Sequence, residues 1–188
     1  MLPKLDRKSS LRFLATVALL TACGPSPATS ATPTAVPFPG IVPTRTPGGA
    51  ASPAGIVVIA QAAIPVEAAV TLQQQADGLS RRRSLTTGTG MLFLFDKSDY
   101  YGFWMKEMLI PLDFVWIDAD CRVAELTANA PPPTPGTPDN ELQVFRPRQP
   151  VRYVLEINGG EAQTHSIRTG STVVFKGDAL QSYGCSTP

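Results

Sequence analysis

The fold of this chain is decided by two apolar segments joined by a short turn: Leu112-Asp113-Phe114-Val115-Trp116-Ile117-Asp118, then Ala119-Asp120, then Cys121-Arg122-Val123-Ala124-Glu125-Leu126. The first segment is rich in β-branched and aromatic residues, which favour strands. The two residues between the segments suit a tight turn. The stretch therefore predicts a β-hairpin, and the residues on both sides of it repeat the pattern of short apolar runs.

Short strands are expected on both sides of the hairpin, because apolar and β-branched runs recur there between turn residues. Thr71 and Gln74 form a capping box, which predicts one short helix over residues 72–80. The expected strands cover residues 56–60, 64–70, 91–95, 100–104, 152–157 and 170–175, and the expected core contains Met91, Leu92, Phe93, Phe95, Phe114 and Trp116. No alternation of strands with helices is visible. The sequence thus predicts a mainly β fold, a compact β-sandwich or jelly-roll-like barrel with one or two short helices.

Composition excludes several classes of protein. The 188 residues include 43% hydrophobic and 16% charged residues, with a net charge of +1. This is enough apolar material for one core, whereas a nucleic-acid binder needs a strongly basic surface. No nucleic-acid partner is therefore expected.

The N-terminal residues carry a targeting signal. Basic residues precede a short apolar run over residues 13–20, which is too short to span a bilayer. The run ends in Leu20-Thr21-Ala22-Cys23, which resembles a bacterial lipobox. We expect residues 1–22 to be a lipoprotein signal peptide and Cys23 to carry the lipid. The alternative is an ordinary signal peptide followed by a mature chain that happens to contain Cys23.

A proline-rich segment separates Cys23 from the β domain. From Gly24 to Ala54 the prolines lie among Ser, Thr, Ala and Gly, and Arg45 is the one charged residue. Such a composition cannot bury enough apolar area to order itself. We expect a disordered tether over residues 23–54, a β domain over 55–178 and a C-terminal tail over 179–188. The expected location is the outer face of the bacterial cytoplasmic membrane or the cell envelope, with the membrane as a partner through the lipid.

Five blocks in the predicted β domain occur in a fixed order. They are Gly78-Leu79-Ser80-Arg81-Arg82, Gly90-Met91-Leu92-Phe93-Leu94-Phe95, Phe103-Trp104-Met105-Lys106, Ile110-Pro111-Leu112-Asp113 and Tyr153-Val154-Leu155-Glu156-Ile157-Asn158-Gly159-Gly160. Together they resemble the domain-of-unknown-function family numbered 192, over roughly residues 56 to 176. The resemblance implies a mainly β, jelly-roll-like fold that is often exported, and it implies no established activity.

The chain departs from the pattern of that family at three places. Glu107-Met108 stands where the family usually has an Asn-Thr pair. Ser80 replaces a favoured Met, and Ser171 replaces an Asp that commonly follows the late glycine. Any polar site that uses the Asn-Thr pair is therefore altered here.

Residues that commonly carry catalysis or hold metals are scarce. His165 is the single histidine, and no serine lies in a Gly-x-Ser-x-Gly elbow, so a hydrolytic triad and a zinc site are not predicted. Asp113, Asp118 and Asp120 offer oxygen ligands for calcium, but their spacing along a strand and turn is typical of surface patterning. We expect His165 in an exposed loop, and no metal and no cofactor.

Charged and aromatic side chains within the five blocks predict a site. The candidate residues are Arg82, Trp104, Lys106, Asp113 and Glu156. They are expected to converge in space, because charges cost desolvation unless they neutralise one another or meet a ligand. In one interpretation Arg82 or Lys106 pairs with Asp113 or Glu156 to hold loops in place; in the other the cluster binds a ligand.

Two classes of function stay open. The first is a binding module for a small molecule, a glycan or an envelope partner. The alternative is a hydrolase-like envelope enzyme that uses Asp113 or Glu156 as a general acid or base. A catalytic acid should lie in a cleft with a raised pKa, whereas a structural carboxylate should be ion-paired with a lowered pKa.

Two cysteines remain once Cys23 carries the lipid. Disulfides persist in exported proteins, and two remaining cysteines in that compartment often pair. We therefore expect a disulfide between Cys121 and Cys185, which would hold the C-terminal tail on the hairpin.

Overall fold

Nine strands and three short α-helices make up the part of the chain that the computed structural model describes, residues 53–186. The predicted signal peptide, Cys23 and most of the predicted tether lie outside these residues. In chain order the elements are β1 (Gly55–Ile59), β2 (Ala62–Ala69), α1 (Leu72–Asp77), β3 (Gly90–Asp99), β4 (Phe103–Trp104), β5 (Leu112–Ile117), β6 (Val123–Ala130), the 3₁₀ turn η1 (Asp139–Glu141), β7 (Val144–Phe145), β8 (Val151–Asn158), α2 (Glu161–Thr164), β9 (Val173–Lys176) and α3 (Asp178–Gln181).

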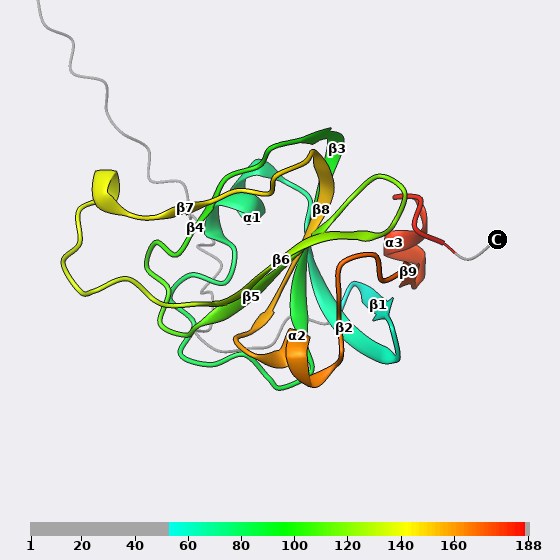
Figure 1. Ribbon diagram of the computed structural model, residues 1–188, viewed down its shortest axis with the longest axis horizontal. Helices are drawn as coiled ribbons and strands as arrows, with labels where there is room; N and C mark the ends of the chain where they lie inside the picture. Colours follow the sequence, from blue (N-terminus) through cyan, green and yellow to red (C-terminus); the bar gives the residue numbers. More distant parts are fainter. Residues whose placement is uncertain (1–52, 187–188) are drawn as a thin grey trace, which may run out of the picture. The chain divides into compact units, whose positions relative to one another are not determined.

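One sheet of seven strands dominates the fold, in the order β6-β5-β8-β3-β2-β1-β9 (Figure 1). The sheet curls into a half-barrel, and β4 and β7 form a separate two-stranded ribbon. The prediction of a mainly β fold is confirmed. The predicted hairpin is confirmed as well, since β5 pairs antiparallel with β6.

The turn of the hairpin is built on Asp118. Its Oδ1 accepts hydrogen bonds from the backbone N–H groups of Asp120, at 3.0 Å, and Arg122, at 2.9 Å. A side chain that closes a turn in this way is typical of aspartate. Asp118, which the sequence analysis considered as a calcium ligand, therefore has a structural role in this turn.

One strand pair differs from the expected pattern. Strands β2 and β3 are parallel neighbours, and α1 lies in the connection between them. The predicted capping box is present, because the Thr71 side chain accepts from Gln74 N–H and the Gln74 side chain accepts from Thr71 N–H. The helix ends at Asp77 and not at residue 80, because Gly78 adopts φ +47°, a left-handed value that glycine tolerates.

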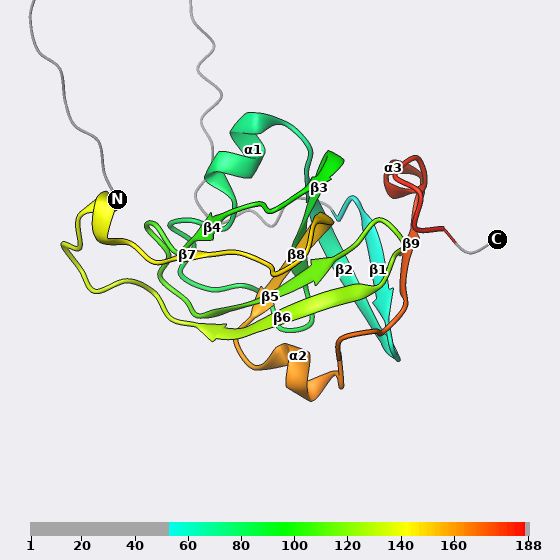
Figure 2. The ribbon, with the colours of Figure 1, turned by 45° about the horizontal axis from the view of Figure 1, so that its top comes forward.

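The sheet is covered on both faces, each with its own apolar cluster. The first cluster includes Leu92, Val115, Leu155 and Ile157, and the second includes Phe93, Phe114, Trp116 and Val154. Helix α1 covers one face and α2 the other, as Figure 2 shows. Of the six expected core residues, five are buried and Phe95 is half-buried. Strands β3, β5 and β8 occupy the middle of the sheet and therefore read as nearly continuous apolar runs.

The C-terminal segment belongs to the core. The predicted disulfide is present between Cys121 and Cys185, whose Cα atoms are 5.5 Å apart. Leu180 of α3 is fully buried in the first cluster. Residues 179–186 of the predicted C-terminal tail are thus packed on the domain, and the disulfide holds them there. None of the helices in residues 53–186 has the length and apolar character needed to span a membrane.

Candidate functional site

A pocket of about 350 Å³ opens on the α1 side of the sheet. Its walls come from α1, from the segment that follows α1, from β3 and from residues 101–108, and its floor includes Glu156 of β8. The aromatic side chains that line it are Phe93, Phe95, Tyr101, Phe103 and Trp104. Apolar walls with a few polar groups are typical of small-molecule sites.

Glu156 is the most unusual residue of the pocket. It is only 5% exposed, and its Oε2 has no hydrogen-bond partner among the described residues. Burial raises the pKa of its carboxyl to about 8, although the positive charge of Arg82 acts in the opposite direction. Near neutral pH this side chain is therefore mostly an uncharged acid.

Gly78 lies beside this carboxyl group. A Cβ at position 78 would stand 4.0 Å from Glu156 Oε2 and 3.4 Å from the edge of the Phe93 ring. The left-handed φ of Gly78 turns the chain away from α1 at this point. The absence of a side chain at residue 78 therefore leaves the surroundings of Glu156 less crowded.

Arg82 lies near Glu156 but pairs with another acid. Its guanidinium binds both carboxylate oxygens of Glu67 on β2, with Nη2 donating to Oε2 at 2.8 Å and Nη1 donating to Oε1. The hydrogen bond to Glu67 raises the pKa of Arg82, against the effect of burial. Bidentate pairs of this kind are among the stronger ion pairs. Arg82 is thus ion-paired with Glu67 and not with Glu156.

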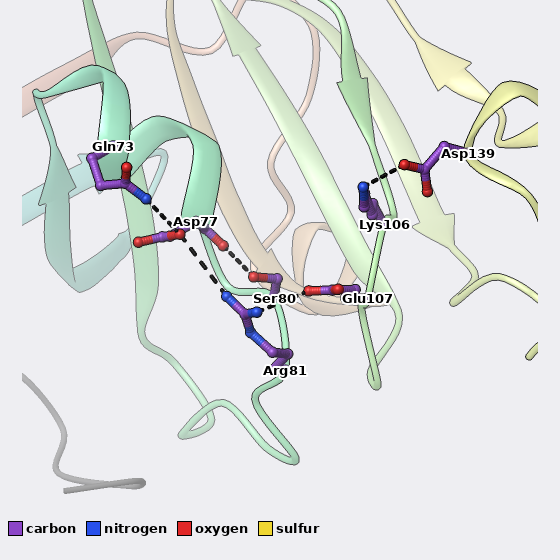
Figure 3. A network of polar contacts seen from close by, with 7 residues as sticks. All are labelled: Gln73, Asp77, Ser80, Arg81, Lys106, Glu107 and Asp139. Carbon is purple, nitrogen blue, oxygen red and sulfur yellow. Dashed lines mark hydrogen bonds and ion pairs between the residues drawn. The ribbon is translucent and has the colours of Figure 1, made fainter. Parts of the chain in front are cut away.

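Trp104 and Lys106 form one edge of the pocket. Trp104 is 46% exposed, and the Lys106 ammonium lies 5.3 Å from the centroid of its ring. Lys106 Nζ also donates to Asp139 Oδ2 of η1 at 2.5 Å, which Figure 3 shows. This hydrogen bond raises the pKa of Lys106. The contact joins the loop of residues 131–142 to the edge of the pocket.

A second ion pair joins two segments of the pocket rim, as Figure 3 shows. The Arg81 N–H donates to the Glu107 carbonyl at 2.8 Å, and the Arg81 guanidinium lies 3.2 Å from the Glu107 carboxylate. Both residues have left-handed backbones, with φ +63° and +55°. Asparagine tolerates that conformation better than most residues do. This accounts for an Asn at position 107 in the family pattern, while Met108, in place of Thr, lines the pocket here.

Asp113 lies away from the pocket. In the pairing of β5 with β8, Phe114 is the partner of Glu156 and Asp113 is the partner of Ile157. Directly paired side chains share a face, so Asp113 points to the opposite face of the sheet. It is fully buried, contrary to the expected surface position, because β5 is covered on both faces.

The Asp113 carboxylate organises the chain around α2. It accepts hydrogen bonds from the backbone N–H groups of Asn129 at 2.6 Å, Gly160 at 2.9 Å and Ala162 at 2.8 Å. These bonds join the end of β6 to the turn between β8 and α2. Asp113 is therefore a structural carboxylate and lies outside the candidate site.

The structure thus divides the five candidate residues. Trp104, Lys106 and Glu156 line one pocket. Arg82 lies close enough to Glu156 to influence its pKa, and Asp113 does not join them. The expected pairing of Arg82 or Lys106 with Asp113 or Glu156 is replaced by pairing with Glu67 and Asp139. The sequence did not predict Glu67 and Asp139 as partners, because neither residue lies in a recognisable local motif.

His165 is half-buried at the end of α2 and not in an exposed loop as expected. Its Nε2 is buried and has no partner among the described residues. It lines a second, more polar pocket with Gln61 and Ser166. Within residues 53–186 no three His, Cys, Asp or Glu side chains are grouped so that they could hold a metal ion.

Comparison with known proteins agrees with the resemblance seen in the sequence. A model of the DUF192 family, described as "Uncharacterized ACR", matches residues 56–175. A proposed transcription regulator from Sinorhizobium meliloti 1021 is 29% identical, with a TM-score of 0.58 over 68% of this chain and 98% of that one. A protein of unknown function from Novosphingobium aromaticivorans DSM 12444 is 33% identical, with a TM-score of 0.57 over 69% and 97%. No curated protein matches the chain.

Proposed function

This chain belongs to the DUF192 family, and we propose that it is a binding module whose ligand is a small molecule held in the pocket over Glu156. One observation carries the proposal. A carboxyl group that is 5% exposed, with an oxygen that has no partner in the described residues, forms part of the floor of an open pocket with aromatic walls. A buried polar group without a partner is costly, and a ligand that hydrogen-bonds to it would remove that cost.

The walls support a ligand with an apolar face. Phe95 stacks on Tyr101 with ring centroids 3.6 Å apart, and Phe103 meets Phe95 edge to face at 6.5 Å. Trp104 adds a partly exposed ring at the mouth. Aromatic side chains supply large contact areas with few rotatable bonds, so they bind ligands at a low entropic cost.

A second candidate function rests on the pKa of Glu156. A carboxyl whose pKa is raised to about 8 in a pocket has the property required of a general acid. Asp113, the other candidate, lies on the opposite face. Two polar side chains in the wall already have backbone partners, since Gln75 donates to the Leu94 carbonyl and Ser80 donates to the Asp77 carbonyl. Binding does not require a second catalytic side chain in the pocket, and we therefore favour a binding module over an enzyme.

A fragment screen tests the proposed site. Small aromatic and alicyclic compounds are added to the full chain, and Trp fluorescence and the melting temperature are recorded. Compounds that bind should change the fluorescence of Trp104 and raise the melting temperature. Trp104→Ala should weaken their binding, whereas Tyr100→Ala, which removes an exposed ring outside the pocket, should not. Binding that is the same in all three proteins would contradict the proposed site.

We further propose that the domain is anchored by lipid on Cys23 to the outer face of the bacterial membrane. The support is the lipobox-like Leu20-Thr21-Ala22-Cys23 behind a basic, then apolar, leader. Acyl chains contribute ~0.8 kcal/mol per buried methylene to membrane binding. Cys23→Ala should move the protein from the membrane to the soluble fraction of cells. Continued partition with the membrane would contradict the anchor.

A further inference from the structure

We infer that the ligand of this pocket is an organic cation, a molecule with an ammonium group joined to an apolar body. The ammonium group would lie against the Glu156 carboxylate, and the apolar body would lie against the aromatic walls. The inference rests on the proposed function, because it assigns the chemical class of ligand to the same site. Three features of the pocket support it.

The first feature is the lack of a counter-charge for Glu156. The strand neighbours that share its face are Met91 on β3 and Phe114 on β5, which are both apolar. Arg82 is the one basic group whose charge affects it, and both carboxylate oxygens of Glu67 already bind that guanidinium. A cation in the pocket would therefore supply the ion-pair partner that Glu156 does not have among the described residues.

The second feature is the state of the other charged groups around Glu156. Arg152, on the same face of β8, donates to the Phe95 carbonyl at 3.4 Å and lies 5.5 Å from the centroid of the Tyr153 ring. Three further basic groups near the pocket are matched by carboxylates, as Arg81 with Glu107, Arg82 with Glu67, and Lys106 with Asp139. Arg146, whose guanidinium lies beside Gly102 of the wall, donates to the Tyr100 carbonyl at 3.0 Å. Asp77, also in the wall, lies 4.0 Å from Arg81. An anionic ligand would have to compete with these carboxylates, whereas a cation would meet the Glu156 carboxyl, whose Oε2 has no hydrogen-bond partner among the described residues.

The third feature is the aromatic wall. Aromatic faces attract cations through their quadrupole, and several rings around one site are the usual arrangement for substituted ammonium groups. The Lys106 ammonium at 5.3 Å from the Trp104 ring already shows one such contact at the pocket edge. Phe95, Tyr101 and Phe103 add three further rings to the wall of the same pocket.

Binding of a permanent cation must be linked to a proton. Below the Glu156 pKa of about 8 the side chain is a carboxylic acid. The cation favours the carboxylate, so the O–H bond of the acid breaks and the proton passes to the buffer. Charge balances, because one cation enters the site and one proton leaves it. Affinity should therefore rise with pH up to about 8 and become constant above it.

The test uses three probes with the same benzyl body: benzyltrimethylammonium, benzyl alcohol and phenylacetate. Titration calorimetry on the full chain at pH 6, 7, 8 and 9 measures each affinity. We expect the cation to bind at least tenfold more tightly than the other two at pH 8. Its affinity should rise up to about tenfold between pH 6 and 7, and repeating the pH 7 titration in a buffer of different ionisation enthalpy should show release of close to one proton.

Two variants and one control variant test which side chains bind the cation. Glu156→Gln keeps the shape of the side chain but cannot ionise, so the cation should lose its pH dependence and at least tenfold of its affinity at pH 8. Trp104→Ala, at a partly exposed position, should weaken binding of the cation severalfold and keep the pH dependence. Tyr100→Ala, outside the pocket, should bind like the parent.

The inference is overturned if benzyl alcohol or phenylacetate binds as tightly as the cation, or if Glu156→Gln binds the cation unchanged. It is also overturned if none of the three probes binds. In each case the fragment screen decides separately on the proposed function, because fragments that need Trp104 would keep the pocket as a binding site and exclude only the cationic class of ligand.

Discussion

Asp113 and Glu156 lie on adjacent antiparallel strands, one position out of register, and their side chains point to opposite faces of the sheet. Both are buried. Three backbone N–H groups satisfy the carboxylate of Asp113, whereas Glu156 has an oxygen without a partner in residues 53–186. The same chemical group thus holds the fold together on one face and forms part of the floor of the pocket on the other.

The Asp113→Asn variant should be less stable and should bind ligands normally. Hydrogen bonds to a charged acceptor contribute about 1.5–3 kcal/mol each, and the amide of Asn can accept at only one of its two side-chain positions. We expect a loss of roughly 2–3 kcal/mol in the free energy of unfolding, measured by urea denaturation. A variant as stable as the parent would show that the three hydrogen bonds do not stabilise the domain.

Stability should fall as the pH rises from about 4.5 to about 8, because of Glu156. Its pKa is 4.5 for an ordinary glutamate and about 8 in the folded protein. Below pH 4.5 both states hold the proton. Between the two values the unfolded chain loses the proton and the folded protein keeps it, so the free energy of unfolding falls by up to about 1.4 kcal/mol per pH unit.

The comparison with Glu156→Gln isolates this effect. The free energy of unfolding of the variant minus that of the parent should increase from pH 5 to pH 8 and then stay constant. Urea denaturation at each pH provides the values. Parallel curves for the two proteins would contradict a raised pKa at this position.

The left-handed backbone at Glu107 should favour asparagine. Most side chains in this conformation cost roughly 1–2 kcal/mol, and the Arg81 ion pair that Glu107 gains is largely exposed and adds little. Glu107→Asn should therefore be more stable than Glu107→Ala by roughly 1 kcal/mol. Both variants lose the ion pair, so their difference reports the backbone alone. Equal urea midpoints would show that residue 107 is not strained in this way.

Removal of the disulfide should destabilise the domain considerably. Cys121 and Cys185 are 64 positions apart, and closing a loop of that length contributes about 4 kcal/mol in the chain-entropy model. The double variant Cys121→Ser/Cys185→Ser should unfold at a clearly lower urea concentration, while Cys23→Ser should match the parent. If the double variant unfolds at the same urea concentration as the parent, the bridge does not stabilise the fold.

Local patterns predicted much of the fold. The β5–β6 hairpin, the central β3 and the Thr71–Gln74 cap are each encoded within a few neighbouring residues. The helices α2 and α3 have four residues each, and β7 has two, so they are too short to show a period. The parallel pairing of β2 with β3 depends on contacts across the sheet and leaves no local pattern.

The candidate site was harder to predict for a related reason. The motifs drew attention to Trp104, Lys106 and Glu156, which do line one pocket. The partners Glu67 and Asp139 lie 15 and 33 positions from the bases they bind, and nothing local pairs them. Which of the two carboxylates finds hydrogen-bond partners depends on the strand register. A shift of one residue in either strand would move the side chains of that strand to the other face of the sheet.

Methyl NMR on the methionines tests the central claim most directly, that a ligand binds over Glu156. The chain has four methionines, and among them Met108 lines the pocket while Met91 and Met105 are buried outside its walls. With ¹³C-methyl methionine, compounds from the fragment screen should shift the Met108 signal in a saturable way and lose this effect in Trp104→Ala. Compounds that bind without moving Met108, or a screen in which none moves it, would contradict the account.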